Sequence, residues 1–431
     1  MKHAIRQLLA ASASLLLWCS FSAQAGELAP LSLQEAKAQG AIIVDTRLSH
    51  FYQGWPMEGE SQGGHVSGAV SLSADWKYDD EQWPQALRDK GLDARKPVAL
   101  YGSERGLAEV ARMLRMRGFH QLYELKGWQE AKRERLVRWQ QLVYPQWLAD
   151  LQAGKPVVAA PKGDWKLFEV DWGAPKAFLI SHIPGADYID TNRLEQEPLW
   201  NKVSDADLEK LLLENGIRHD TTVVLYGRNT MAAARAAHLM MYAGVKDVRL
   251  LDGGIEAWFI AHLRTKTGLP HQYEAAESFG AKIPVHPEYL TSTEQAKALL
   301  KQSDGELVSI RTWDEFIGET SGYSYIEPKG DIPGAKWGHG GVDSQSMSDF
   351  HNPDGTMKPS SEILAMWQQW QIAPQDQTAF YCGTGWRASE AFFYAWLMDW
   401  KRISVYDGGW YEWSSDPKNP TITGERKPSE G

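Results

Sequence analysis

The sequence predicts an α/β protein made of three tandem units, each a mainly parallel sheet flanked by helices. Three segments begin with an apolar run typical of a buried strand and continue with a helical pattern: residues 98–119, 222–244 and 378–400. When these segments are aligned on the tyrosine that ends each strand, Gly102 and Gly227 fall where Cys382 falls. Because strands alternate with helices throughout, we expect parallel sheets covered by helices.

Each unit is expected to repeat one order of elements around this central strand and helix. It opens with a helix start, at "LSLQEA", "YPQWLA" or "HPEYLT". An apolar strand and a glycine turn follow, the turns being "GHVSGAV", "SHIPGAD" and "GDIPGAK". After the central strand and helix, each unit closes with an apolar run and a glycine turn that contains Trp: "LYELKGW", "VRLLDGGIEAW" and "ISVYDGGWYEW". The threefold recurrence of this order indicates three copies of one domain.

We place the units at residues 27–138, 139–278 and 279–431. Residues 131–143, "AKRERLVRWQQLV", are predicted to form a basic amphipathic helix that bridges the first two units. A solvated face or a domain contact suits this helix better than membrane binding. Residues 265–284 are predicted to be a linker into the third unit.

The first residues have the pattern of a cleaved secretory signal. A basic start precedes an apolar run, and "AQA" at residues 23–25 is a small-residue cleavage site. The apolar run is shorter than a membrane span and is interrupted by serines. We therefore interpret residues 1–25 as a removed signal and expect a periplasmic protein.

Composition limits the partners. The chain of 431 residues is 43% hydrophobic and carries a net charge of −10. An acidic, evenly mixed chain argues against nucleic acid or an anionic membrane as the partner. The 12 histidines are scattered, and neither zinc-ligand spacing nor a dinucleotide fingerprint appears, so we expect no metal and no cofactor.

Cys382 is the one cysteine that remains when the predicted signal, which contains Cys19, is removed. A free thiol is only about 3% thiolate at pH 7, so a nucleophilic cysteine needs local stabilisation of its anion. The loop "CGTGWR" after the strand supplies it, because its glycines let backbone N–H groups point inward and the following helix adds its positive end. A buried structural cysteine is the alternative, but the two glycines and Arg387 favour a functional one.

An anion-binding cysteine loop suits a phosphatase, an arsenate reductase, a peroxidase or a sulfurtransferase. Phosphatase loops of similar shape place five residues between Cys and Arg, whereas four separate Cys382 from Arg387. The tighter loop favours a single sulfur over a tetrahedral oxyanion. A peroxidase would need a resolving cysteine or an external thiol, and the mature chain has no second cysteine.

The repeated motifs resemble the rhodanese superfamily of sulfurtransferases over nearly the whole mature chain. The similarity rests on a strand that ends in Asp-x-Arg (residues 45–47, weakened to Ser-Ile-Arg at 309–311), a GHIPGA-like turn, and a Cys-x-x-x-x-Arg loop before a helix. The resemblance implies a thiosulfate sulfurtransferase in which Cys382 takes the outer sulfur of the donor as a persulfide and passes it to a thiol or cyanide. The first two units lack the cysteine, so we expect only the third to be catalytic.

The expected site combines the nucleophile with groups that bind the donor. Cations are expected where sulfite departs, because negative charge develops there. The predicted substrate-binding residues are Gly383, Thr384, Gly385, Trp386, Arg387 and Arg311. For Arg311, a structural ion pair with Asp314 or Glu315 is the alternative.

Two further residues are expected near the cleft. Trp337, together with Trp386, is expected to form its wall. The glycine-rich segment 336–347 lacks the end of a phosphate-binding loop, and we interpret it as a loop near the site that carries His339.

A binding protein is the main alternative from another class. Such a protein would be a scaffold, or a sulfur carrier that hands its persulfide to a specific protein acceptor with little free turnover. The retained cysteine loop favours catalysis, and the two loops without cysteine favour a scaffold role for the first two units.

Overall fold

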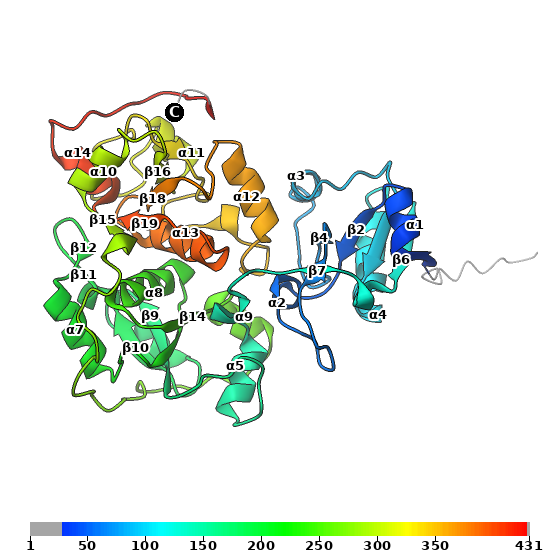
Figure 1. The fold of residues 1–431 in the computed structure, drawn as a ribbon, viewed down its shortest axis with the longest axis horizontal. Helices are drawn as coiled ribbons and strands as arrows, with labels where there is room; N and C mark the ends of the chain where they lie inside the picture. The colour runs from blue at the N-terminus through cyan, green and yellow to red at the C-terminus, as the bar shows by residue number, and fades with distance from the viewer. Residues whose placement is uncertain (1–27, 429–431) are drawn as a thin grey trace, which may run out of the picture.

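The three repeated segments fold into three separate sheets (Figure 1). The structure is a computed structural model that describes residues 28–428, and the predicted signal at residues 1–25 lies outside them.

The first unit contains β1 (Ala29–Ser32), α1 (Leu33–Ala38), β2 (Ile42–Asp45), α2 (Ser49–Gln53), β3 (His65–Val66), β4 (Val70–Ser71), α3 (Trp83–Asp89), β5 (Val98–Tyr101), α4 (Glu104–Arg115), β6 (Leu122–Lys126), η1 (Trp128–Glu130) and β7 (Arg133–Glu134).

The second unit contains η2 (Trp139–Gln141), β8 (Leu142–Val143), α5 (Pro145–Gln152), β9 (Trp165–Asp171), α6 (Lys176–Ile180), β10 (Asp187–Asp190), η3 (Thr191–Arg193), β11 (Glu195–Gln196), β12 (Asn201–Lys202), α7 (Asp205–Glu214), β13 (Thr222–Tyr226), α8 (Thr230–Ala243), β14 (Asp247–Leu251) and α9 (Gly254–Ile260).

The third unit contains η4 (Pro287–Tyr289), β15 (Leu290–Thr291), α10 (Thr293–Leu299), β16 (Gly305–Ser309), α11 (Trp313–Ile317), β17 (Lys336–Trp337), η5 (Ser348–Phe350), α12 (Ser360–Gln368), β18 (Gln377–Tyr381), α13 (Trp386–Leu397), β19 (Ile403–Tyr406) and α14 (Gly409–Ser415).

All three sheets have five parallel strands in one topology. The orders are β1-β6-β5-β2-β4, β8-β14-β13-β9-β10 and β15-β19-β18-β16-β17. The apolar run that ends in tyrosine is the central strand each time. Parallel strands bring their carboxyl ends to one edge of the sheet, so the residues that follow β16 and β18 meet there. The predicted fold class is confirmed.

The helix predicted for residues 131–143 is wrong. This segment contains β7, which pairs antiparallel with β3, and β8, which joins the edge of the second sheet. Between them Trp139 is buried and packs edge-on against Trp55, with ring centroids 4.7 Å apart. Contacts with two units on either side of the segment therefore override its helical periodicity.

The start of the third unit also differs from the prediction. "HPEYLT" forms η4 and the short edge strand β15, and α10 begins only at Thr293. Ser292 caps α10 in a capping box with Gln295, which satisfies the first free N–H groups of this helix. The capping signal lay just beyond the segment in which we expected the helix to start.

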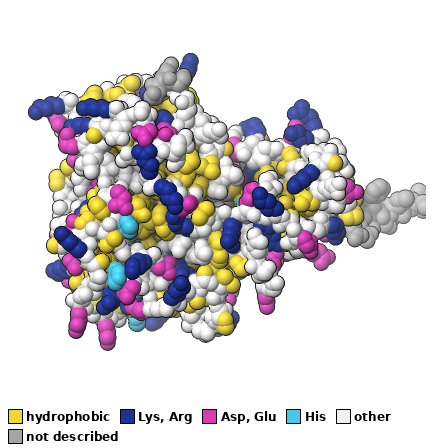
Figure 2. Space-filling model, viewed as in Figure 1, with side chains coloured by type: hydrophobic (Ala, Val, Ile, Leu, Met, Phe, Trp, Pro, Cys, Tyr) yellow, Lys and Arg dark blue, Asp and Glu magenta, His cyan; other side chains and the backbone are white. Residues whose placement is uncertain are grey.

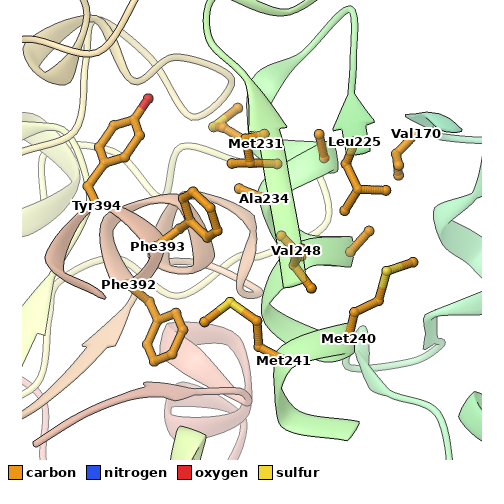
Figure 3. Packing of buried hydrophobic residues seen from close by; sticks show 14 of the residues in the cluster. Val170, Leu225, Met231, Ala234, Met240, Met241, Val248, Phe392, Phe393 and Tyr394 are labelled. Atoms are coloured by element: carbon orange, nitrogen blue, oxygen red, sulfur yellow. The ribbon is translucent and has the colours of Figure 1, made fainter. Parts of the chain in front are cut away.

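The second and third units pack through the helices that follow their central strands. Every residue of α8 from 231 to 243 is buried, as expected for a helix that is apolar on all sides. In Figure 3, Met231, Ala234 and Met241 of α8 lie opposite Phe392 and Phe393 of α13. The carboxyl ends of β13 and β18 are thereby held close to a common interface.

The first unit forms a separate lobe on the right in Figure 1. Its side-chain contacts with the third unit include three polar ones: Lys90 with Glu362 at 2.7 Å, Ser49 with Thr356 at 2.8 Å, and Trp76 with Asp354 at 2.9 Å. The first unit thus meets the third mainly through hydrogen bonds and ion pairs. Trp55 and Leu136 of the first unit also join the apolar core that the second and third units share.

On the face seen in Figure 2, basic and acidic side chains are interspersed, and no large patch of one charge sign is visible. None of the helices within residues 28–428 has the length and apolar character needed to span a bilayer.

Candidate active site

Cys382 lies directly after β18, where the chain turns into α13. Its side chain is buried, with 1% of the residue exposed. The sulfur accepts the backbone N–H of Gly385, the N-cap residue of α13, at an N···S distance of 3.1 Å. A backbone N–H at the amino end of a helix therefore points at the sulfur, which is the arrangement that stabilises an anionic sulfur.

Both glycines of the loop are required by its surroundings. A Cβ atom on Gly383 would lie 2.3 Å from the ring of Tyr323. Gly385 has a φ of +128°, in the region that favours glycine, and its Cβ would lie 3.1 Å from Nη1 of Arg235. The loop can therefore take this path only because side chains are absent at both positions.

Arg387 is held in a buried bidentate ion pair beside the loop. Nη1 and Nη2 donate to the two carboxylate oxygens of Glu315 at 2.8 and 2.9 Å, and Nη2 also donates to the Tyr323 hydroxyl at 2.9 Å. Burial alone would raise the pKa of Glu315, but Arg387 and Arg311 hold that pKa at about 2. The pair is ionised at neutral pH, and contact between Arg387 and a donor stays a prediction.

Arg311 is fully buried and makes structural contacts. Its Nη1 donates to the Gly330 carbonyl at 2.8 Å and to Asp331 at 3.3 Å, and its Nε lies 3.6 Å from Glu315. In the first unit, Arg47 donates to the corresponding Gly64 carbonyl at 2.7 Å. Because the first unit has no cysteine, this contact serves the fold in both units. The ion-pair alternative thus describes the observed state of Arg311, and a role in donor binding stays a prediction.

A cavity of about 450 Å³ adjoins the loop between the second and third units. Its third-unit side includes Thr384, Trp386 and Arg387, and its second-unit side includes Trp172, Glu195 and Trp200. Three of the predicted loop residues thus line a cleft, and nearly half of its wall comes from the second unit. The other predicted site residues are not part of this lining: Cys382, Gly383, Gly385 and Arg311. None of the described residues of the first unit lines this cavity.

Two charged residues of the second unit were missed by the sequence analysis. Glu195 Oε1 accepts the Trp386 Nε1–H at 2.6 Å, and its Oε2 accepts from Arg235 Nε at 3.2 Å. Burial raises the pKa of Glu195 to about 7, although Arg235 and Trp386 act in the opposite direction. A signal was present for Arg235, which is a lone cation within the apolar helix α8.

The structure places two expected residues away from the cavity. Trp337 packs edge-on against Trp313 with ring centroids 4.8 Å apart, and its Nε1–H donates to the Arg311 carbonyl at 2.8 Å. His339 stacks on Trp337. Neither residue lines the 450 Å³ cavity. The prediction that Trp337 forms a wall of the cleft is therefore wrong, because its ring packs in an aromatic cluster of the core instead. Trp386 does line the cavity.

The positions equivalent to Cys382 leave no room for a side chain. A Cβ on Gly102 would lie 2.4 Å from Oγ1 of Thr46, and one on Gly227 would lie 2.3 Å from the Asn229 carbonyl oxygen. No set of three or more His, Cys, Asp or Glu side chains within residues 28–428 is arranged to hold a metal ion. In the described chain, the loop after β18 is the one that combines a cysteine with the amino end of a helix.

Three units of one α/β topology, with a single cysteine at the head of a helix in the last, define the class of protein. The Rhodanese-like domain family matches residues 29–133, 145–261 and 292–416, and the chain belongs to this family. It is 54% identical over 429 residues to the thiosulfate sulfurtransferase YnjE of Escherichia coli, covering 98% of both chains. The crystal structure of YnjE matches with a TM-score of 0.92, over 95% of this chain and 100% of that one.

Two other relatives have names that refer to functions other than thiosulfate sulfur transfer. An anaerobic ergothioneine biosynthesis enzyme from Chlorobium limicola, solved with its natural substrate trimethyl histidine, matches at 36% identity and a TM-score of 0.88, over 93% of this chain and 100% of that one. The sulfur carrier protein TtuD of Thermus thermophilus is 31% identical over 260 residues, which are 57% of this chain and 86% of TtuD.

Proposed function

We propose that this protein is a thiosulfate sulfurtransferase that works through a persulfide on Cys382. The observation that carries the proposal is the buried sulfur that accepts the Gly385 N–H at the head of α13, beside a cavity shared by two units. The similarity to a thiosulfate sulfurtransferase over 98% of the chain supports thiosulfate as the donor.

In the first half-reaction, the Cys382 thiolate attacks the outer sulfur of thiosulfate. A sulfur–sulfur bond forms to Cys382, the sulfur–sulfur bond of thiosulfate breaks, and sulfite leaves with the electron pair. The Gly385 N–H and the amino end of α13 stabilise negative charge on the cysteine sulfur before the attack and on the persulfide after it. Attack by the thiolate form requires no proton transfer to a general base during the step.

In the second half-reaction, an acceptor thiolate or cyanide attacks the terminal sulfur of the persulfide. The persulfide bond breaks, its electron pair returns to Cys382 as the thiolate, and the product is a new persulfide or thiocyanate. The cycle is ping-pong and has no net oxidation.

Mass spectrometry of the protein after incubation with thiosulfate tests this proposal. We expect one added sulfur atom on the Cys382 peptide and release of one sulfite per chain. Subsequent addition of cyanide should remove the added sulfur and yield thiocyanate. An unmodified Cys382 peptide after incubation with thiosulfate would contradict the proposal.

A sulfur carrier is the alternative, supported by the similarity to TtuD. In that case the persulfide would form at a normal rate but discharge slowly to cyanide and small thiols, and a protein acceptor would be required. Comparing single-turnover loading with steady-state turnover separates the two functions. A fast loading step followed by negligible turnover favours the carrier.

The cavity favours a second candidate acceptor, larger than cyanide. Trp172, Trp200, Tyr325 and Trp386 present aromatic rings beside the Glu195 carboxyl, a combination that suits an organic cation. The related Chlorobium limicola enzyme was solved with trimethyl histidine, which is such a molecule. Incubating the thiosulfate-loaded protein with trimethyl histidine and assaying for ergothioneine tests this acceptor.

For residues 1–25 we propose a cleaved secretory signal that delivers the protein to the periplasm. Amino-terminal sequencing of protein recovered from the periplasmic fraction tests this, with a new terminus expected after residue 25.

A further inference from the structure

Trp386, the first residue of α13, is hydrogen-bonded to a residue of the second unit. Its Nε1–H donates to Glu195 Oε1 at 2.6 Å, and Glu195 belongs to β11 of the second unit. Glu195 is only 4% exposed, so this contact is shielded from solvent. The Glu195 carboxyl of the second unit thereby fixes the Trp386 indole at the start of α13, the helix that follows Cys382 in the third unit.

Arg235 supports the same loop from behind. It is fully buried on α8; its Nε donates to Glu195 and its Nη2 donates to Asp407, directly after β19, at 2.6 Å. Its Nη1 has no hydrogen-bond partner among the described residues and would lie 3.1 Å from a Cβ on Gly385. The guanidinium thus packs on the backbone of the residue whose N–H faces the Cys382 sulfur.

These polar contacts are not needed to hold the units together. The adjacent α8–α13 contact is mostly apolar and continuous with the main core, with one hydrogen bond from Thr230 to Glu390. Taking a guanidinium and two carboxyl groups out of water carries a desolvation cost, and apolar replacements of such groups are often neutral or stabilising. Holding the two units together therefore does not explain why Glu195 and Arg235 are buried here. Positioning the Cys382 loop does explain it.

We propose that Glu195 and Arg235 are positioning residues for the Cys382 loop, so that the second unit completes the active site of the third. Glu195 acts through the indole of Trp386, and Arg235 acts through the backbone of Gly385. The inference rests on the proposed function only where sulfur transfer is the measured quantity.

Variants of Glu195 in the full-length protein separate positioning from stability. Glu195→Met removes the acceptor of the Trp386 N–H, and we expect persulfide formation from thiosulfate to slow about 10- to 100-fold, as for a small misplacement of reacting groups. Glu195→Gln keeps an acceptor oxygen and should restore most of the rate. Glu306→Met is the matched control, because Glu306 is a buried carboxyl paired with Lys336 at the opposite end of the third sheet. It should form persulfide at the normal rate.

A double-mutant cycle tests whether Glu195 acts through the indole. Trp386→Phe removes the N–H donor without leaving Arg235 unpaired, so it remains informative if Glu195→Met fails to fold. If Glu195 acts through Trp386, the two losses will not add, and Glu195→Met will have little further effect in the Trp386→Phe background. Fully additive losses would overturn this route.

Amide hydrogen exchange gives a readout that is independent of sulfur chemistry. We expect Glu195→Met and Arg235→Lys to speed exchange in residues 382–390, with the Lys variant closer to wild type than Arg235→Gln, while Glu306→Met leaves that peptide unchanged. Faster exchange in the loop of a protein that forms no persulfide would support positioning and reject the proposed function. Wild-type exchange and wild-type persulfide formation in both Glu195→Met and Arg235→Gln would overturn the inference.

Discussion

The second and third units share one strand order, but the loop after the central strand is used differently in each. In the second unit, Arg228 follows Gly227 in that loop and pairs with Glu169 at 3.0 Å. In the third unit, the corresponding buried arginine, Arg311, comes from the end of the neighbouring strand β16. The loop after β18 is therefore left free to curl around a sulfur. The origin of this arginine separates the second unit from the third. The first unit takes its own, Arg47, from the end of β2 as the third unit does, and differs from it by having Gly102 at the position of Cys382.

The largest effect is expected from replacing Cys382. Cys382→Ser should abolish persulfide formation and all sulfur transfer, because Gly102 and Gly227 stand at the equivalent positions of the other units. The change is nearly isosteric, and the hydroxyl can still accept the Gly385 N–H, so thermal unfolding should shift little. Residual transfer to cyanide in this variant would show a second site.

Truncation compares the two units that lack a cysteine. A fragment of residues 139–431 keeps the 450 Å³ cavity and the α8–α13 contact, so it should still form the Cys382 persulfide. A fragment of residues 279–431 exposes the apolar face of α13 that meets α8, and it should be far less stable and prone to associate. Thermal unfolding, gel filtration and persulfide mass spectrometry report the difference. Equal stability of the two fragments would contradict the larger contribution that we assign to the α8–α13 contact.

A cysteine placed at position 227 of the second unit tests whether the local geometry of the loop is required. Gly227→Cys should form no persulfide, because a Cβ there would lie 2.3 Å from the Asn229 carbonyl oxygen, and the strain should cost about 1–3 kcal/mol of stability. Gly163→Cys is the control, since nothing lies within 4 Å of its Cβ. Chemical denaturation and mass spectrometry measure both effects, and a persulfide on Cys introduced at 227 would show that a free loop is not the requirement.

The smallest effect is a pH dependence of stability that differs between the two units. Burial raises the pKa of Glu195 to about 7, so the folded state holds a proton that the unfolded state releases from about pH 4.5 upward. Stability from this group is present at low pH and is lost as pH rises through 7. Glu315 behaves oppositely: its pKa of about 2 gives stability that is present above pH 4.5 and lost as pH falls toward 2.

Denaturation between pH 5 and 8 measures the Glu195 contribution. Glu195→Gln should flatten the fall in stability between pH 5 and 7. Glu315→Gln should lower stability throughout the measured range without changing that slope. Glu306 also contributes to the fall, because burial raises its pKa to about 7, so the double variant Glu195→Gln/Glu306→Gln should show the flattest profile. An unchanged slope in the double variant would contradict this account.

The repeat and the fold class could be predicted from the sequence alone, and Cys382 could be singled out there as the candidate nucleophile. Apolar strands that alternate with helices specify parallel sheets wherever they occur, and a cysteine followed by two glycines and a helix is a local pattern that packing does not alter. The same local logic failed for residues 131–143, where the helical periodicity was overridden by Trp139 packing against Trp55 across a unit boundary.

Only the tertiary structure decided which side chains surround Cys382. Glu195 and Arg235 lie 187 and 147 positions before it in the chain, and only the packing of α8 against α13 brings them to the loop. The partners of Arg311 and Arg387 were likewise open in the sequence, because any nearby carboxylate can pair with a buried guanidinium and proximity is set by the fold. Local patterns fix what one segment can form, whereas a site built from two units depends on contacts that no single segment encodes.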